Sequence, residues 1–176
     1  MGAILTSMAR FSLGATVSRT VIACALLLPS LTASTQDLQH LGSFHNVTSQ
    51  DRGEHCSGYS LGLWKYRDEL LGLLDVHAGL CGDPPCAAIR GATLDAKSGR
   101  LEFSASIDGQ TIQFEGTMTR AAIVGLFNGR RARLARDTQG TDEEFEPNRS
   151  LRAWCRFWGS VPRCRGVREL CELTLH

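Results

Sequence analysis

Residues 58–62, Gly-Tyr-Ser-Leu-Gly, match the G-x-S-x-G pattern that surrounds the nucleophilic serine of many hydrolases. Such a serine needs a base to take its hydroxyl proton, and the histidines that follow Ser60 are His77 and His176. Ser60 with His77 is therefore the catalytic pair that the sequence offers. The alternative is that Ser60 is an ordinary strand residue.

The surroundings of Ser60 favour the strand. A nucleophile elbow needs a buried strand before the serine and a helix after it. Residues 47–55 are polar and cannot be that buried strand. The chain is also too short, and too rich in alternating segments, for the repeated βαβ units of an α/β-hydrolase. We therefore expect no catalytic residue, with a small secreted serine hydrolase using Ser60 and His77 as the alternative.

A second set of residues could bind a metal. His55, Cys56, His77, Cys81 and Cys86 are of the types that hold tetrahedral zinc. However, the spacing from Cys81 to Cys86 is wider than in a zinc knuckle, and no second matching pair exists. An exported chain meets an oxidising compartment, which favours disulfides. We therefore predict neither a metal nor a cofactor.

Six cysteines lie beyond residue 33, an even number that suits three disulfides. They are Cys56, Cys81, Cys86, Cys155, Cys164 and Cys171. We expect Cys81 to pair with Cys86 across the Gly-Asp-Pro-Pro turn. Cys56 should then pair with one of the three cysteines of the tail, and the last two with each other.

The charged residues do not indicate a site. Alternation places Glu102 and Glu115 on the solvent side of a sheet, and nothing places Asp75 and Asp83 in a cleft. The arginines between residues 130 and 168, with aromatic residues among them, resemble surfaces that bind single-stranded nucleic acid. Acidic residues separate the two basic groups, the formal net charge is only +1, and the chain carries an export signal. We therefore expect no nucleic-acid partner.

Residues 1–33 have the features of a bacterial signal peptide. Arg10 and Arg19 precede a short apolar run, and small residues follow it. The run is too short to span a bilayer, so we expect no transmembrane segment. Residues 21–24, Val-Ile-Ala-Cys, resemble a lipobox that would attach a lipid to Cys24, but most of the apolar run lies after Cys24. We predict a secreted or periplasmic protein.

The centre of the chain predicts an antiparallel meander. Apolar and polar residues alternate on both sides of Asp108-Gly109, and Asn128-Gly129 again separates two short runs. Such dipeptides form the tight turns of β-hairpins. A two-residue loop at Asp108-Gly109 pairs Phe103 with Phe114 on the core face. Residues 70–77 suit either a strand or a short helix, and we favour the strand.

The predicted fold is mainly β, a small barrel-like sheet followed by a helical tail stapled by disulfides. A signal peptide covers 1–33, a flexible leader 34–54, the β-meander 55–136, an acidic linker 137–149, and the helical tail 150–176. Leu151, Trp154, Cys155 and Trp158 fall at helical spacing in that tail.

Residues 58–64, 71–74 and 98–105 resemble small exported bacterial β-proteins of uncharacterised function. Gly62-Leu63-Trp64 also resembles the G-x-W start of calycins, the lipocalins and avidins. The resemblance covers residues 57–127, and the seven or so strands we count fall short of the eight of a lipocalin. It implies a binding barrel and not an enzyme.

We therefore expect an exported, non-enzymatic binding or structural protein that could be associated with the cell envelope. Its partner would be another protein or a small apolar ligand. Trp64, Trp154 and Trp158 are the candidate contacts, because exposed aromatic residues often anchor interfaces. The inward apolar residues of the sheet form either a small cup or a filled core, and a filled core is the usual outcome in a small barrel.

Overall fold

The computed structural model describes residues 38–138 and 150–175. The signal peptide with Cys24, most of the acidic linker and His176 lie outside these residues. The elements are β1 (Gln39–His45), β2 (Thr48–Gln50), η1 (Asp51–Gly53), β3 (His55–Tyr66), β4 (Glu69–Leu80), β5 (Cys86–Leu94), β6 (Arg100–Ile107), β7 (Gln110–Met118), β8 (Ala122–Phe127), β9 (Arg130–Arg136), α1 (Leu151–Gly159), β10 (Cys164–Arg165) and α2 (Val167–Thr174). No helix in the described ranges is long and apolar enough to cross a membrane.

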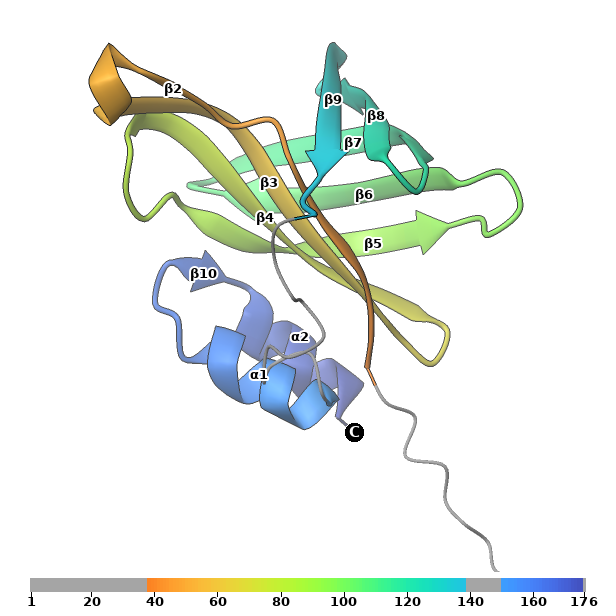
Figure 1. The fold of residues 1–176 in the computed structure, drawn as a ribbon. Helices are drawn as coiled ribbons and strands as arrows, with labels where there is room; N and C mark the ends of the chain where they lie inside the picture. Colours follow the sequence, from red (N-terminus) through yellow and green to blue (C-terminus); the bar gives the residue numbers. More distant parts are fainter. Residues whose placement is uncertain (1–37, 139–149, 176) are drawn as a thin grey trace, which may run out of the picture. The chain divides into compact units, whose positions relative to one another are not determined.

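Eight antiparallel strands close into a barrel (Figure 1). The meander runs from β3 to β9, and β1 pairs with both of its ends, so that neither end remains an open edge. The expected flexible leader is therefore wrong for residues 39–45 and 48–50, which form β1 and β2. The expected seven strands are one fewer than the eight of the barrel. Leu41 and Phe44 pack into the barrel core and hold β1 in place.

The hairpins follow the local sequence signals. Asp108 and Gly109 have φ of 50° and 77°, and Asn128 and Gly129 have φ of 46° and 78°, as tight hairpin turns require. Phe103 pairs with Phe114, and their ring centroids are 5.0 Å apart. Residues 70–77 are strand. These predictions are confirmed.

Side chains fill the barrel interior. Phe114 lies 5.0 Å from Phe103 and 4.7 Å from Phe127, and Tyr59 stacks on Phe127 at 4.3 Å between ring centroids. The aliphatic residues around these rings are almost fully buried. Of the two outcomes expected for the inward residues, the structure has the filled core.

The seam between β1 and β9 is short, with two residue pairs. Arg136 reinforces it by donating to the Leu41 carbonyl at 2.8 Å and to the Arg120 carbonyl at 2.6 Å. Its guanidinium also lies 4.7 Å from the centre of the Phe44 ring. A Cβ on Gly42 would lie 2.1 Å from this guanidinium, so the close approach of Arg136 requires glycine there.

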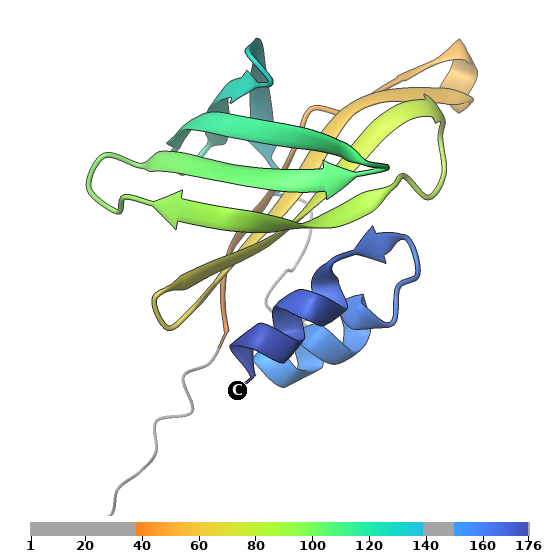
Figure 2. The same ribbon diagram turned by 180° about the vertical axis from the view of Figure 1, so that it is seen from behind.

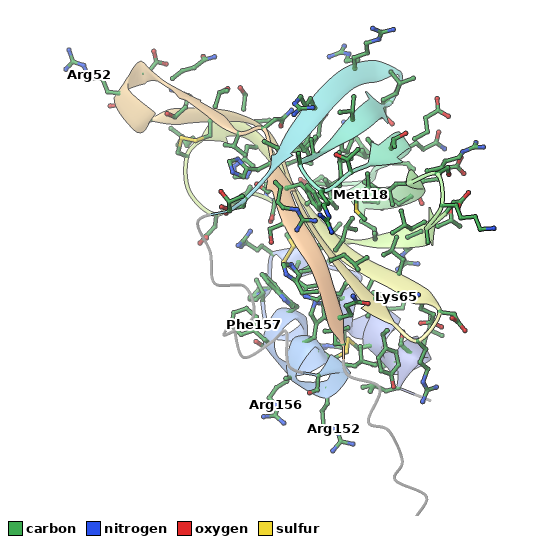
Figure 3. The ribbon with its side chains drawn as sticks, turned by 45° about the vertical axis from the view of Figure 1, so that its right-hand side comes forward. Arg52, Lys65, Met118, Arg152, Arg156 and Phe157 are labelled. Carbon is green, nitrogen blue, oxygen red and sulfur yellow. A yellow bond between two sulfur atoms is a disulfide. The ribbon has the colours of Figure 1, made fainter. Side chains whose placement is uncertain are left out.

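The two tail helices pack on the outer face of the barrel beside β3, β4 and β5 (Figure 2). Ser150 caps α1 by accepting a hydrogen bond from the Ala153 amide at 3.1 Å. Trp154 is fully buried in this second core. Arg152 and Arg156 project from α1 away from the sheet (Figure 3). The predicted helical tail is confirmed.

Three disulfides are present, but not in the expected pairs. They are Cys56–Cys81, Cys86–Cys164 and Cys155–Cys171. The expected Cys81–Cys86 bridge is wrong. Cys81 directly follows β4, its amide donates to the Glu54 carbonyl, and its Cα lies 4.9 Å from that of Cys56. Cys86 instead starts β5, where it pairs with Cys164 of the tail. Cys56 consequently does not reach the tail. Cys155–Cys171 joins the two helices, so the tail is stapled both to itself and to the barrel.

Candidate functional site

Ser60 lies in the middle of β3 on the outer face of the barrel. Its neighbours Tyr59 and Leu61 point into the core, and alternation along the strand turns Ser60 outward. β3 is flanked on both sides, with His45 of β1 and Asp75 of β4 as the residues opposite Ser60. β3 continues to Tyr66 and β4 follows it, so Ser60 lacks the helix that comes directly after the serine of a nucleophile elbow.

Ser60 and His77 are nevertheless in contact. His77 of β4 stands opposite Gly58 of β3, so it is a diagonal neighbour of Ser60 on the same face of the sheet. The Ser60 Oγ and His77 Nε2 atoms are 3.2 Å apart. This is the separation of a nucleophile and its base in a serine hydrolase. The sequence named both residues, and the ladder between β3 and β4 brings them together.

Asp75 lies near this pair but is bound elsewhere. Arg163 Nη1 from the tail donates to the Asp75 carboxylate at 3.0 Å and to the Pro84 carbonyl at 2.8 Å. Burial raises the pKa of Asp75, and the positive charge and hydrogen bond of Arg163 oppose part of that rise. Within the described residues no hydrogen bond joins Asp75 to His77. Asp75 therefore ties the tail to β4 through Arg163, and it interacts with His77 only through their charges.

A pocket of about 220 Å³ opens beside Ser60. We call it the Ser60 groove. Its polar lining comes from His40, Ser43, His45, Ser60, Asp75 and Asp137, and Trp158 of α1 contributes an aromatic wall. The Ser43 hydroxyl and His40 Nε2 are 3.4 Å apart. Ser60 is thus part of a hollow with several hydrogen-bonding side chains.

Sequence reasoning missed four of these residues. His40, Ser43 and His45 fell in the predicted leader, and Asp137 in the predicted linker. Leu38, Leu41 and Phe44, spaced three residues apart among polar ones, were the signal that this segment packs against the barrel. The imidazoles enter the groove because β1 pairs with β3, a contact between segments that no local pattern encodes.

The three tryptophans named as partner contacts form one cluster. The Trp64 ring lies 5.6 Å from Trp154 and 6.5 Å from Trp158. Trp64 and Trp154 are 4% and 0% exposed, so the expectation that Trp154 is an exposed contact is wrong. Both rings serve to pack the tail on the barrel. Trp158 is partly exposed and lines the Ser60 groove.

The structure also decides between metal ligation and disulfides for the cysteines. Cys56, Cys81 and Cys86 are oxidised, so they hold no thiolate for zinc. Among the described residues no group of three or more His, Cys, Asp and Glu side chains could hold a metal ion. Glu102 and Glu115 face each other across β6 and β7, each at least partly open to solvent.

Comparison with known proteins does not extend this description: no family model, curated protein or solved structure matches the chain.

Proposed function

We propose that this protein is exported to the periplasm or the medium and acts there as a non-enzymatic binding protein that uses the Ser60 groove. One observation carries the proposal. Ser60 sits mid-strand between two paired neighbours, so its own peptide group belongs to the sheet. Hydrolases of this type need backbone amides aimed at the developing oxyanion. The groove therefore suits recognition better than acyl transfer.

The location of the groove supports the same function. The interior of the barrel is filled, so a ligand must bind outside it. The groove combines imidazole, hydroxyl and carboxylate groups with the ring of Trp158, a lining that suits a ligand able to make hydrogen bonds. Three disulfides are consistent with an oxidising compartment, as export requires.

The second candidate function is hydrolysis by Ser60, and the 3.2 Å contact with His77 is the observation that favours it. His77 would take the Ser60 proton as Oγ attacks an ester or peptide carbonyl. His45 stands opposite Ser60 on β1, and its imidazole would have to replace the missing amide donor. We place this function second because Asp75 is bound to Arg163.

One set of proteins separates the two functions. The mature protein, Ser60→Ala, His77→Gln and a control, Ser106→Ala, are treated with a fluorophosphonate and with ester and peptide substrates. Ser106 is an exposed serine on β6 and does not line the groove. We expect no turnover and no labelling of Ser60. Hydrolysis that is lost in Ser60→Ala and retained in Ser106→Ala would overturn the binding proposal.

Native mass spectrometry of the same purified proteins provides the positive test. We expect the mature protein to carry a ligand or partner from its native compartment. Ser60→Ala should lose that mass because it removes a hydrogen-bonding group from the groove. His77→Gln should weaken it because His77 contacts the Ser60 hydroxyl from beside the groove. Ser106→Ala should keep it.

A further inference from the structure

The strands β4 and β5 are paired along only part of their length and separate toward the start of β4 and the end of β5. They pair only at Leu73–Ala88, Leu74–Ala87 and Asp75–Cys86. Residues 69–72 of β4 and 89–94 of β5 have no partner in the other strand. Figures 1 and 2 both show the β3–β4 hairpin diverging from β5 in this region.

A bulge-like register shift in β5 lies within the stretch that separates from β4. The register of β5 with β6 shifts between Arg90 and Thr93, and Gly91 inside that interval has φ of +58°. A bulge of this kind bends one strand away from its neighbour, and glycine takes the left-handed conformation without strain. β5 therefore stays with β6 and leaves β4 beyond Ala88.

A groove of about 460 Å³ lies between the separated strands, and its walls are β4, β5 and α2. We call it the β4–β5 groove. Its apolar lining is wholly aliphatic and consists of Leu70, Leu71, Ile89, Ala92, Leu170 and Leu173. Leu173 stands at the rim with 75% of its surface exposed. An exposed leucine beside an aliphatic groove is typical of a surface that another chain covers.

The charged rim of the groove is acidic. Asp68 and Glu69 are exposed and belong to no ion pair in the described part of the chain. Their neighbour Arg67 lies over the Tyr66 ring instead, 5.1 Å from its centre. At the other side Glu169 and Arg90 neutralise each other in a salt bridge. The unbalanced charge of the groove is therefore negative.

We propose that the β4–β5 groove binds an extended segment of a partner protein that carries an aliphatic side chain flanked by Lys or Arg. The unpaired stretches of β4 and β5 offer main-chain groups to such a strand. The aliphatic lining would take its apolar side chain, and Asp68 and Glu69 its basic flanks. This surface is distinct from the Ser60 groove, so a test of this proposal does not depend on the function proposed above.

The test uses the acetylated, fluorescently labelled pentapeptide Lys-Val-Leu-Val-Lys amide and measures its anisotropy with the full mature protein. Three control peptides accompany it: one with Glu in place of both Lys, one with Ser in place of the apolar residues, and one N-methylated at the central Leu. We expect binding of the first peptide, weakened by salt, and at least tenfold weaker binding of each control, because each lacks one of the three recognised features.

Protein variants locate the site. Leu173→Ser should weaken peptide binding at least tenfold, and Asp68→Asn combined with Glu69→Gln should weaken it and reduce its salt dependence. Leu80→Ser is the matched control, because Leu80 is 80% exposed on β4 and lies outside the groove. Amide NMR shifts should concentrate in residues 69–72 and 89–92.

Four results would overturn the proposal. The first is absence of peptide binding by the folded protein, and the second is equal loss of binding in Leu173→Ser and Leu80→Ser. The third is occupation of the groove by something else, detected as a co-purifying acyl lipid or a dimer that Leu173→Ser abolishes. Undiminished binding of the N-methylated peptide would also contradict pairing with a strand edge.

Discussion

The Cys86–Cys164 disulfide joins the tail to the barrel and should be the most stabilising of the three. It closes a segment of 78 residues, against 25 for Cys56–Cys81 and 16 for Cys155–Cys171. In the chain-entropy account, a loop of that length restricts the unfolded state by about 4.5 kcal/mol, compared with about 3 kcal/mol for the shortest loop. The other two bridges provide no shortcut around the long loop, so its contribution remains in their presence.

The perturbation is the double variant Cys86→Ala, Cys164→Ala, compared with Cys155→Ala, Cys171→Ala. Cys86 and Cys164 are 2% and 7% exposed, and alanine keeps their positions apolar. Urea unfolding, followed by the fluorescence of the tryptophan cluster of Trp64, Trp154 and Trp158, gives the free energy of unfolding of each protein. We expect the first variant to lose more stability than the second, by about 1.5 kcal/mol from the logarithm of the loop lengths.

A larger loss in the Cys155–Cys171 variant, or an unchanged free energy of unfolding in the Cys86–Cys164 variant, would refute this reasoning. Non-reducing peptide mapping checks its premise directly. A peptide pair linking Cys81 to Cys86 would show that the local pairing forms and that the tail is not held by Cys164.

Three further predictions concern the barrel and its outer face. Phe114→Ala should lower the free energy of unfolding by about 3–5 kcal/mol, because the ring is buried between Phe103 and Phe127; urea unfolding measures it. Gly125→Ala should cost about 1–3 kcal/mol by the same measurement, since the new Cβ would lie 2.2 Å from a carbonyl oxygen of β7, whereas Gly82→Ala, with open space around it, should cost little. Burial raises the pKa of Asp75, so its protonated form stabilises the native state below about pH 3.8, and that contribution is lost as pH rises through the raised native pKa. The melting temperature of wild type should therefore fall relative to that of Asp75→Asn as the pH is raised from 3 to 7. A constant difference between the two melting temperatures would contradict the assignment.

The candidate site shows how far local patterns reach. The sequence named Ser60 and His77 and placed Ser60 on a strand, because the strand alternation lies in adjacent residues. It did not determine that their side chains meet. That contact depends on the register of β3 with β4, where Gly58 faces His77. The sequence allowed either a strand or a short helix for residues 70–77, so it did not determine this register.

The residues of β1 that line the Ser60 groove could not be predicted from local patterns. His40 and His45 lie in a polar segment whose apolar residues are too sparse to display a strand period. They become strand residues because β1 covers the open edges of β3 and β9, which are far apart in the chain. Trp154 was predicted to be exposed because helical spacing shows only that one face of α1 is apolar. It does not show which surface covers that face.

By itself the sequence determined the elements that adjacent residues control. These are the hairpins at Asp108-Gly109 and Asn128-Gly129 and the pairing of Phe103 with Phe114. The even number of cysteines in an exported chain also indicated three disulfides. Turn conformation and alternation arise from neighbouring residues, so they can be read from a short segment. Only the tertiary structure decided which cysteines bond, how the barrel closes and what surrounds Ser60. Those outcomes depend on which outward-facing side chains the closed barrel and the packed tail bring within reach, and that is a property of the whole chain.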